Sequence, residues 1–420
     1  MQILLVHQNF PGQFVHLAPA LAARGHNVIA LTASTNTNNY PNGISLAKYN
    51  WDPPTFDRKT FRLARTYSEM CYRGEIVASA AIELRDRHGV NPDIVFGTPG
   101  WGETLFLREI WTEATHILYG EFFYGPRGLD VGFDPELYKG DLAARMAVTS
   151  NNAHLLVATH AADKILSPTH WQARSFPDYI RHRVTVIHDG IDTDRVAPAA
   201  DAVAQVPGTD IVLRKGDEVL TFINRNLEPH RGYHIFMRAL PKVMAARPNV
   251  RVVIIGGDGI SYSLRPPGDK TWKDIFLDEV KDRLDMSRVH FVGKVPYPTF
   301  VNLMRVTRVH AYLTYPFVLS WSMLEAMAAG ALVVGSRTPP VQELITDGVN
   351  GRLVDFFDVG GWSEALIEAL AEPARYDACR AAARETIVGQ YDLRRICLPR
   401  LVEFVEQSGV KPTTLRGVPA

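Results

Sequence analysis

Short, continuous apolar runs alternate along the chain with longer stretches in which apolar residues recur at every third or fourth position. The first run is Gln2–Val6 and the second is His26–Leu31, and such runs are typical of parallel strands buried on both faces. Between them, residues 14–22 have helical spacing and Gly25 provides a stop signal. This strand–helix–strand unit predicts the start of a doubly wound parallel sheet.

The alternation continues less regularly over the first half of the chain. Residues 35–60 are rich in Asn, Pro and Asp and are expected to form a loop, and residues 61–88 a long helix. Residues 124–138 form a second long loop, rich in Gly and Asp, and loops of that length are usually functional. Further strands are predicted at residues 93–97, 117–120, 164–167 and 184–187.

The stretch His188–Gly208 has little periodicity and is the best domain boundary in the chain. A second α/β series follows, with strands predicted at residues 219–223, 250–255, 289–292, 311–314, 331–335 and 351–354, and helices at 232–246, 320–329, 361–372, 374–388 and 394–406. We therefore expect an α/β fold of two Rossmann-like doubly wound domains facing across a cleft. The predicted parts are an N-terminal domain (1–195), a C-terminal domain (196–390), and a last helix and tail (391–420), with the helix packing back on the N-terminal domain.

Composition narrows the class of protein. The 420 residues include 45 Lys and Arg and 45 Asp and Glu, and this balance argues against general nucleic-acid binding. Cys71, Cys379 and Cys397 form no CxxC pair, and no His spacing suits a metal, so we expect reduced thiols and no metal site. No basic run precedes the first apolar stretch, and no apolar run is long enough to span a bilayer. We expect a cytoplasmic protein and leave peripheral contact with a membrane open.

Two segments of the second series carry candidate chemistry. In Pro316–Gly351, a strand is followed by a loop and a helix that Ser320 can cap, and the first N–H groups of such a helix favour an anion. Glu325 lies about one turn further on and suits the two hydroxyls of a ribose, although a solvated helix carboxylate explains the spacing equally well. In Asn224–Gly232, Arg225 and Arg231 follow a strand and match a diphosphate. Alternatively, these arginines are surface residues paired with acids such as Glu228.

With both segments taken together, the chain resembles the retaining glycosyltransferases of family 4, which have the two-domain GT-B fold. The resemblance rests on Arg225, on Arg231-Gly232, on the run Leu324-Glu325-Ala326-Met327-Ala328-Ala329-Gly330, and on Glu343, Asp347-Gly348 and Asn350-Gly351. It is specific over residues 219–355 and looser in the first half, where Pro11-Gly12-Gln13 matches the family's glycine-bearing loop. The opening HQNFPGQF and the stretch Pro99–Glu103 are similar to one subgroup of the family.

The resemblance implies a sugar transfer from a nucleotide-diphosphate sugar to a hydroxyl acceptor, which could be a saccharide, a lipid-linked or a protein-linked group. It implies that Arg225 and Arg231 neutralise the leaving diphosphate and that Glu325 holds the ribose. No metal or other cofactor is expected. The remaining donor contacts implied are the close approach of Gly12, the base against Val292 and Lys294, and phosphate on the backbone of Ser320, Trp321, Ser322 and Met323.

Two departures from the family pattern are visible. Phe317 stands eight positions before Glu325, where the family usually has a glutamate that touches the donor sugar. The family's histidine near residue 98 is also absent, and Glu103 is our candidate for a catalytic polar group on the acceptor or sugar side. Alternatively, Glu103 is a first-turn helix residue favoured by the helix dipole. Trp101, Phe122, Phe123 and Tyr124 could form a platform for a sugar face, or simply belong to the core.

Other functions remain open at this point. A sugar-nucleotide epimerase of similar build would need an acid/base pair over the sugar, and none is evident in the sequence. A protein that binds nucleotide sugars without catalysis is conceivable because of Phe317. A nicotinamide dehydrogenase is a distant further alternative, because neither half carries the full glycine fingerprint.

Overall fold

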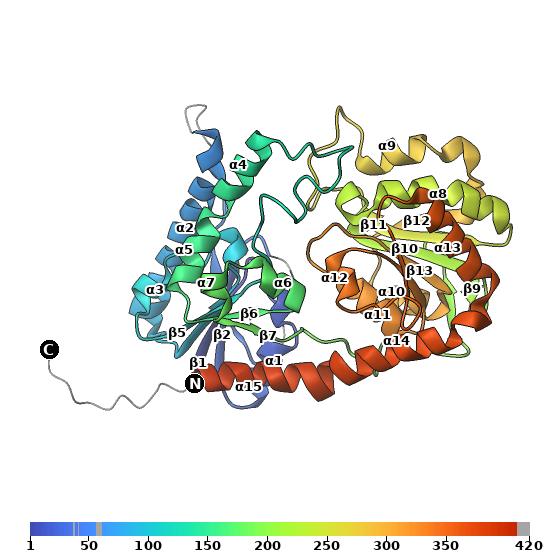
Figure 1. Cartoon of the computed structure of the whole chain (residues 1–420). Coiled ribbons are helices and arrows are strands. Elements are labelled where there is room, and N and C mark those ends of the chain that lie inside the picture. The colour runs from blue at the N-terminus through green and yellow to red at the C-terminus, as the bar shows by residue number, and fades with distance from the viewer. Residues whose placement is uncertain (37, 41, 56–60, 410–420) are drawn as a thin grey trace. The chain divides into compact units, whose positions relative to one another are not determined.

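The computed structural model describes residues 1–36, 38–40, 42–55 and 61–409, and the predicted tail beyond residue 409 lies outside these residues. The chain divides into two compact units, each described by itself below (Figure 1). The first comprises residues 1–189 together with the chain from residue 394 onward, and the second comprises residues 190–393. The division along the chain falls between Asp189 and Gly190, near the predicted boundary at residue 195.

The first unit is built on a seven-stranded sheet in the order β3-β2-β1-β4-β5-β6-β7, in which every neighbouring pair is parallel. This is the strand order of a Rossmann-like sheet, extended by one strand. Strand β3 lies within residues 35–60, so the prediction of a continuous loop there was wrong. The strands are β1 (Gln2–Val6), β2 (Asn27–Ala33), β3 (Ser45–Tyr49), β4 (Ile94–Gly97), β5 (Thr115–Tyr119), β6 (Lys164–Ser167) and β7 (Val184–Val186).

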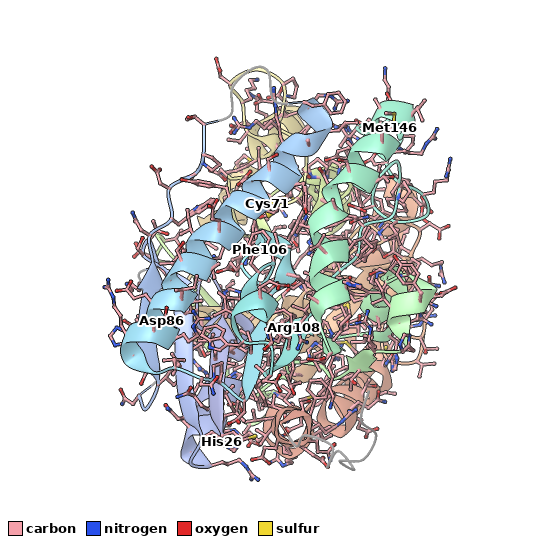
Figure 2. All side chains as sticks on the ribbon, turned by 90° about the vertical axis from the view of Figure 1, so that its left-hand side faces the viewer. His26, Cys71, Asp86, Phe106, Arg108 and Met146 are labelled. Carbon is pink, nitrogen blue, oxygen red and sulfur yellow. The ribbon has the colours of Figure 1, made fainter. Side chains whose placement is uncertain are left out.

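Helices cover both faces of this sheet, and α2, α3, α4 and α5 lie together on the side seen in Figure 2. The last helix, α15, belongs to this unit, where Glu406 accepts hydrogen bonds from Arg24 Nε at 2.6 Å and binds His26 Nε2 at 2.9 Å. The helices are α1 (Leu17–Ala23), α2 (Arg65–His88), α3 (Leu107–Ile110), α4 (Leu142–Asn151), α5 (Ala153–Ala161), α6 (His170–Ser175), α7 (Asp178–Arg181) and α15 (Leu398–Ser408), with short 3-10 turns η1 (Gly12–Phe14), η2 (Arg62–Ala64) and η3 (Pro99–Trp101).

The second unit contains a six-stranded parallel sheet in the order β12-β11-β10-β13-β14-β15. It also has an antiparallel hairpin of β8 (Val203–Gln205) and β9 (Val212–Arg214), partly inside the stretch that looked irregular in the sequence. The sheet strands are β10 (Val219–Asn226), β11 (Arg251–Gly257), β12 (Val289–Gly293), β13 (Val309–Tyr312), β14 (Leu332–Ser336) and β15 (Arg352–Val354).

The helices of this unit pack on its sheet and fix the position of the segments that follow the strands. Their bounds are η4 (Pro229–Arg231), α8 (Tyr233–Ala246), α9 (Trp272–Asp278), α10 (Tyr297–Val306), α11 (Trp321–Ala328), α12 (Pro339–Gln342), α13 (Val359–Ala371) and α14 (Asp377–Gln390). The expected α/β class with two Rossmann-like domains is thus confirmed. Among the described helices, none combines the length and apolarity that crossing a bilayer would require.

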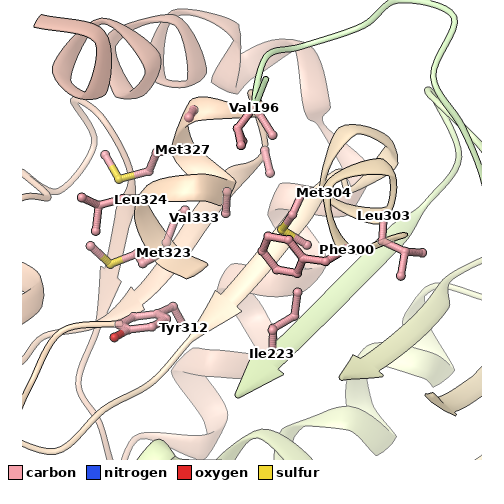
Figure 3. Packing of buried hydrophobic residues seen from close by; sticks show 14 of the residues in the cluster. Val196, Ile223, Phe300, Leu303, Met304, Tyr312, Met323, Leu324, Met327 and Val333 are labelled. Carbon is pink, nitrogen blue, oxygen red and sulfur yellow. The ribbon is translucent and has the colours of Figure 1, made fainter. Parts of the chain in front are cut away.

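Helix α11 is held by a hydrophobic core on its inner side (Figure 3). Met323, Leu324 and Met327 are fully buried there, in the same cluster as Tyr312 of β13 and Val333 of β14. Because a fully buried aliphatic side chain contributes roughly 1.5–3 kcal/mol, this packing fixes both the axis and the rotation of α11. The position of Glu325, on the same helix, is set by it.

Candidate functional site

Arg231 is the most deeply placed cation of the candidate donor site. It lies in η4, directly after β10, and only 5% of its surface is exposed. Its Nη1 donates to Thr314 Oγ1 at 2.8 Å and to the carbonyl oxygen of Val318 at 2.7 Å. Both acceptors lie in the loop that leads into α11, so the structure brings the two candidate segments of the second series together at this guanidinium.

No described carboxylate pairs with Arg231. Instead, its guanidinium lies 5.1 Å from the ring centre of Tyr262 and 5.7 Å from that of Phe317. The pKa of neighbouring His230 is lowered well below its ordinary value, by burial and by the charge of Arg231, so this imidazole is neutral at physiological pH. A buried cation bounded by aromatic rings and a neutral imidazole retains its attraction for an anion.

Glu228 does not pair with the arginines as the alternative interpretation required. It is fully buried, and its Oε2 accepts hydrogen bonds from the backbone N–H groups of Ser261, Tyr262 and Ser263 at 3.2, 3.1 and 2.9 Å. Backbone N–H groups stabilise a carboxylate much as a cation does. Glu228 therefore fixes the loop after β11, including the Tyr262 ring beside Arg231.

Arg225 lies near the carboxyl end of β10 and Lys294 directly after β12, the two strands that pair with β11 on either side. Arg225 is exposed on β10, and no hydrogen bond or ion pair of its side chain is found within the described chain. A Cβ placed on Gly257, the last residue of β11, would lie 2.9 Å from Lys294 Cε and 3.5 Å from the carbonyl oxygen of Arg225. Gly257 thus lies between the two basic residues, at the edge where parallel sheets bind ligands. Val292 lies two residues before Lys294 on β12, half-buried against the core.

Helix α11 begins as the sequence predicts, with Ser320 as its cap, whose Oγ accepts from Ser322 N–H at 3.4 Å. The N–H groups of this turn already have acceptors within the protein: Ser320 N–H donates to Tyr312 Oη at 2.8 Å, and Met323 N–H to the Ser320 carbonyl at 3.3 Å. The 3.4 Å bond of Ser322 is the weakest of these, so an anion would most easily compete for that donor. Trp321 presents 38% of its surface to solvent, whereas Met323 is buried.

Glu325 is 7% exposed on α11 and is not a solvated helix carboxylate. Its Oε1 accepts from Tyr297 Oη at 2.7 Å. Burial raises the pKa of Glu325 above its ordinary value, opposed by Tyr297 and by the charge of Arg195. The Arg195 guanidinium lies 4.4 Å from the Tyr297 ring centre. The result is a buried acceptor with one oxygen occupied by a phenol.

In the first unit, the loop after β1 contains Gly12, with φ of +48°. A Cβ at this position would lie 2.5 Å from His7 Cε1 and within 3.0 Å of two further ring atoms, so only glycine fits. Burial lowers the pKa of His7 to about 4, and its Nδ1 accepts from Asn9 N–H at 3.0 Å. The ring is therefore neutral, and the loop backbone lies directly on it.

Glu103 lies in the segment that follows β4. It follows η3 and precedes α3 without belonging to a helix, so the helix-dipole interpretation was wrong. Its side chain is fully buried, accepts from Tyr49 Oη at 2.6 Å, and has its pKa raised by burial to about 7. Arg73, itself buried, opposes this shift and donates to Gln8 Oε1. Glu103 is thus part of a polar network beneath the carboxyl ends of β1, β3 and β4.

The aromatic platform divides into two pairs. Phe122 and Phe123 are buried and belong to the core, whereas Trp101 is 47% and Tyr124 36% exposed. The Arg73 guanidinium lies 3.7 Å from the ring centre of Trp51, a half-buried residue that the sequence did not single out. Trp51 and Trp101 therefore flank the polar network of Glu103, since Trp101 lies 5.9 Å from the same guanidinium.

Sequence reasoning missed three polar residues of these sites: Tyr297, Tyr49 and Arg73. Tyr297 is separated from Glu325 by 28 residues and Tyr49 from Glu103 by 54, and nothing in local spacing connects them. The one available signal was Pro296 directly before Tyr297, because a proline often marks the start of a helix. Within the described residues, no cluster of His, Cys, Asp and Glu could hold a metal ion.

Comparison with known proteins matches both halves of the chain. Residues 24–196 match the family "Glycosyl transferase family 4 group", and residues 210–386 match the family "Glycosyl transferases group 1". A D-inositol 3-phosphate glycosyltransferase of Mycolicibacterium smegmatis is 31% identical over 219 residues, which are 51% of this chain and 46% of that protein. The chain thus spans about half the length of the curated relatives that it matches.

Solved structures superpose on almost the whole chain. Sucrose-phosphate synthase from Thermosynechococcus elongatus superposes with a TM-score of 0.71 at 18% identity, covering 97% of this chain and 98% of that one. HepE of Anabaena in complex with UDP-glucose superposes with a TM-score of 0.65 at 15% identity, covering 97% and 100%. At these identities the structures support the fold, whereas the two family matches together cover most of the sequence. The chain belongs to the family-4 glycosyltransferases, which have the GT-B fold.

Proposed function

We propose that this protein is a retaining glycosyltransferase, which moves a sugar from a nucleotide-diphosphate donor to a hydroxyl group of a glycan, glycolipid or glycoconjugate. The observation that carries the proposal is Arg231, a buried guanidinium that no described carboxylate neutralises. Such a cation is costly to keep unless it meets an anion during function. A leaving diphosphate is an anion of the required charge, and the family provides one.

In this proposal the donor binds the second unit at the carboxyl ends of its strands. Arg225 and Arg231 bind the diphosphate, and the α11 turn from Ser320 to Met323 contributes N–H groups, with Ser322 N–H exchanging its long bond for a phosphate oxygen. Stabilisation of charge that develops on a leaving group is commonly the largest catalytic contribution. Arg225 is free to move toward the ligand because it is exposed.

In this proposal the nucleoside part of the donor binds beside Glu325 of α11 and the end of β12. The ribose hydroxyls donate to Glu325, whose remaining oxygen is oriented by the bond from Tyr297. Val292 and Lys294 lie beside the base, at the end of β12. HepE was crystallised with UDP-glucose, which makes a uridine donor the first choice in an assay, although the base remains a prediction.

Phe317 changes how the sugar is held. Its ring is buried against His230 at 4.8 Å and Tyr262 at 4.9 Å between ring centres, so an aromatic wall stands where relatives place a carboxylate. Sugar hydroxyls are then expected to bind backbone groups rather than a side-chain carboxylate at this position. Because the wall adds no negative charge, it also avoids repelling the diphosphate.

The chemical step needs no separate base. The bond from the anomeric carbon to the diphosphate oxygen breaks, and the acceptor oxygen bonds to that carbon from the same face. The acceptor's proton passes to the departing phosphate oxygen, so charge and atoms balance. Glu103 acts in this scheme as a positioning residue for Tyr49 and Arg73 rather than as a catalytic group, because it is fully buried. Independence from metal is a prediction that turnover in EDTA tests.

The proposal is tested by incubating the purified protein with UDP-, GDP-, ADP- and dTDP-sugars, with and without sugar, lipid-linked and protein acceptors, and following nucleotide release. Release that depends on an acceptor, with product of unchanged anomeric configuration, supports it. A converted sugar nucleotide without acceptor would instead show an epimerase. Tight donor binding without turnover on any acceptor would show a binding protein.

A further inference from the structure

An exposed apolar surface with arginines around it lies on the first unit, where η2 meets α4. We call it the η2–α4 face and define it by Leu63, Leu142, Met146, Arg127 and Arg145. These residues line a hollow of about 390 Å³, together with Pro126 and two hydroxyl side chains of α4. Figure 2 shows Met146 on the outer side of α4, near the end of the molecule where α2 begins. Neither the proposed donor site nor the polar network of Glu103 uses these residues.

The exposure of this face is unusual for large apolar side chains. Leu142 is 65% and Met146 is 48% exposed, and Phe61, directly before η2, is 70% exposed. Two elements separated in sequence present them, since Ser150 of α4 donates to the carbonyl oxygen of Leu63. Single exposed apolar residues need no explanation, but several gathered around one hollow mark an interaction surface.

The charges around the face are predominantly positive. Arg62, Arg127 and Arg145 take part in no ion pair within the described residues, and Arg145 donates only to the carbonyl oxygen of Gly140, at 3.2 Å. The nearest acid on α4 is Asp141, whose carboxylate caps the helix by accepting from Ala144 N–H at 2.9 Å. The face therefore combines apolar side chains with guanidiniums that lack a counter-charge.

We propose that the η2–α4 face binds the surface of an anionic lipid bilayer. Leu142 and Met146 enter the boundary between headgroups and acyl chains, while Arg127 and Arg145 pair with lipid phosphates. A second copy of the chain fits the face poorly, because a twofold contact would place the same unpaired arginines opposite one another. A bilayer supplies both an apolar layer and phosphates at its edge. The inference does not depend on the proposed function.

The test is sedimentation of the full-length protein with vesicles of phosphatidylcholine alone and of phosphatidylcholine with phosphatidylglycerol. We expect binding to the anionic vesicles that weakens as salt is raised. The variant L142D/R145E should bind about 100-fold less, because each charge near an anionic surface contributes about fivefold and the two substitutions together make the face three charges more negative. The matched control is V212D/R214E, which makes the same changes at exposed positions of β9 in the other unit. It should bind like the wild type.

Several results would overturn the proposal. These are no binding to either vesicle, equal binding to both, or an equal loss in the control variant. A wild-type dimer in sedimentation analysis that L142D/R145E dissociates would assign the face to a second copy instead. Both variants change exposed side chains, so their thermal midpoints and circular dichroism spectra should match those of the wild type and show that each remains folded.

Discussion

The substitution Glu325→Gln separates a binding role from a structural one, because its effects on affinity and stability should have opposite signs. The carboxylate is 7% exposed and keeps one hydrogen bond, from Tyr297, which an amide oxygen can also accept. Hydrogen bonds to a charged group contribute about 1.5–3 kcal/mol, against about 0.5–1.5 kcal/mol for neutral pairs. Two ribose hydroxyls donating to a neutral amide instead of a carboxylate therefore lose about 2 kcal/mol together, or about 30-fold in Kd.

The free energy of unfolding of E325Q should not fall as its affinity for the nucleotide does. Burial raises the pKa of Glu325, so the folded chain binds the proton more tightly than the unfolded chain does. The charged carboxylate consequently costs folding free energy at neutral pH, and this cost disappears as the pH falls through the folded pKa. E325Q, which is neutral at every pH, should be at least as stable as the wild type at pH 7, with the two converging in acid.

The assay pairs calorimetric titration of a nucleoside diphosphate with urea denaturation at pH 7 and in acid. Glu364→Gln is the matched control, because its side chain is 73% exposed on α13 of the same unit, and neither readout should change. An E325Q protein that binds the nucleotide as well as the wild type would refute the ribose assignment. One that is clearly less stable at pH 7 would refute the argument from burial.

Three further predictions concern other parts of the two units. Arg225→Ala should lower kcat/KM for the donor by about 10²–10³-fold without changing the thermal midpoint, because the side chain is exposed. Arg231→Ala should lower both kcat/KM and the thermal midpoint, because it removes the hydrogen bonds at 2.7 and 2.8 Å. A loss of stability in Arg225→Ala alone would contradict this. Gly12→Ala should destabilise the first unit by about 1–3 kcal/mol in chemical denaturation, because the added Cβ would lie 2.5 Å from the His7 ring and the backbone φ is +48°. An unchanged midpoint would contradict this and show that the loop adapts freely. Glu103→Gln should remove the fall in stability that the wild type shows as the pH rises from about 4.5 to about 7, because the folded pKa is raised to about 7; parallel pH profiles of the two proteins would contradict the assignment.

The fold was predictable where local pattern and burial agree. Continuous apolar runs such as Gln2–Val6 can only be strands buried on both faces, and Ser320 before an apolar helix identified the start of α11. Strand β3 escaped because it is an edge strand whose residues are mostly exposed. Its sequence therefore carries no apolar run, and the Asn- and Pro-rich segment before it suggested a loop.

The candidate site was predictable only in part, because its partners come from distant segments. Arg231 and Glu325 became candidates through their place after a strand and near a helix start, and the family resemblance implied their roles, but the groups that set their environments were not predicted. Glu228 lies three residues before Arg231 and looked like its ion-pair partner, yet its carboxylate binds backbone N–H groups about 35 residues along the chain. Tertiary hydrogen bonds of this kind leave no periodic signal in the sequence.

The central claim is that a buried guanidinium and an exposed one receive a diphosphate at the carboxyl ends of the second sheet. The most direct measurement is calorimetric titration of wild type and Arg225→Ala with each nucleoside diphosphate and with the nucleoside of the preferred base. The wild type should bind the diphosphate at least about 100-fold more tightly than its nucleoside, and Arg225→Ala should lose about tenfold or more of that difference. Equal affinity of the wild type for diphosphate and nucleoside would contradict the account.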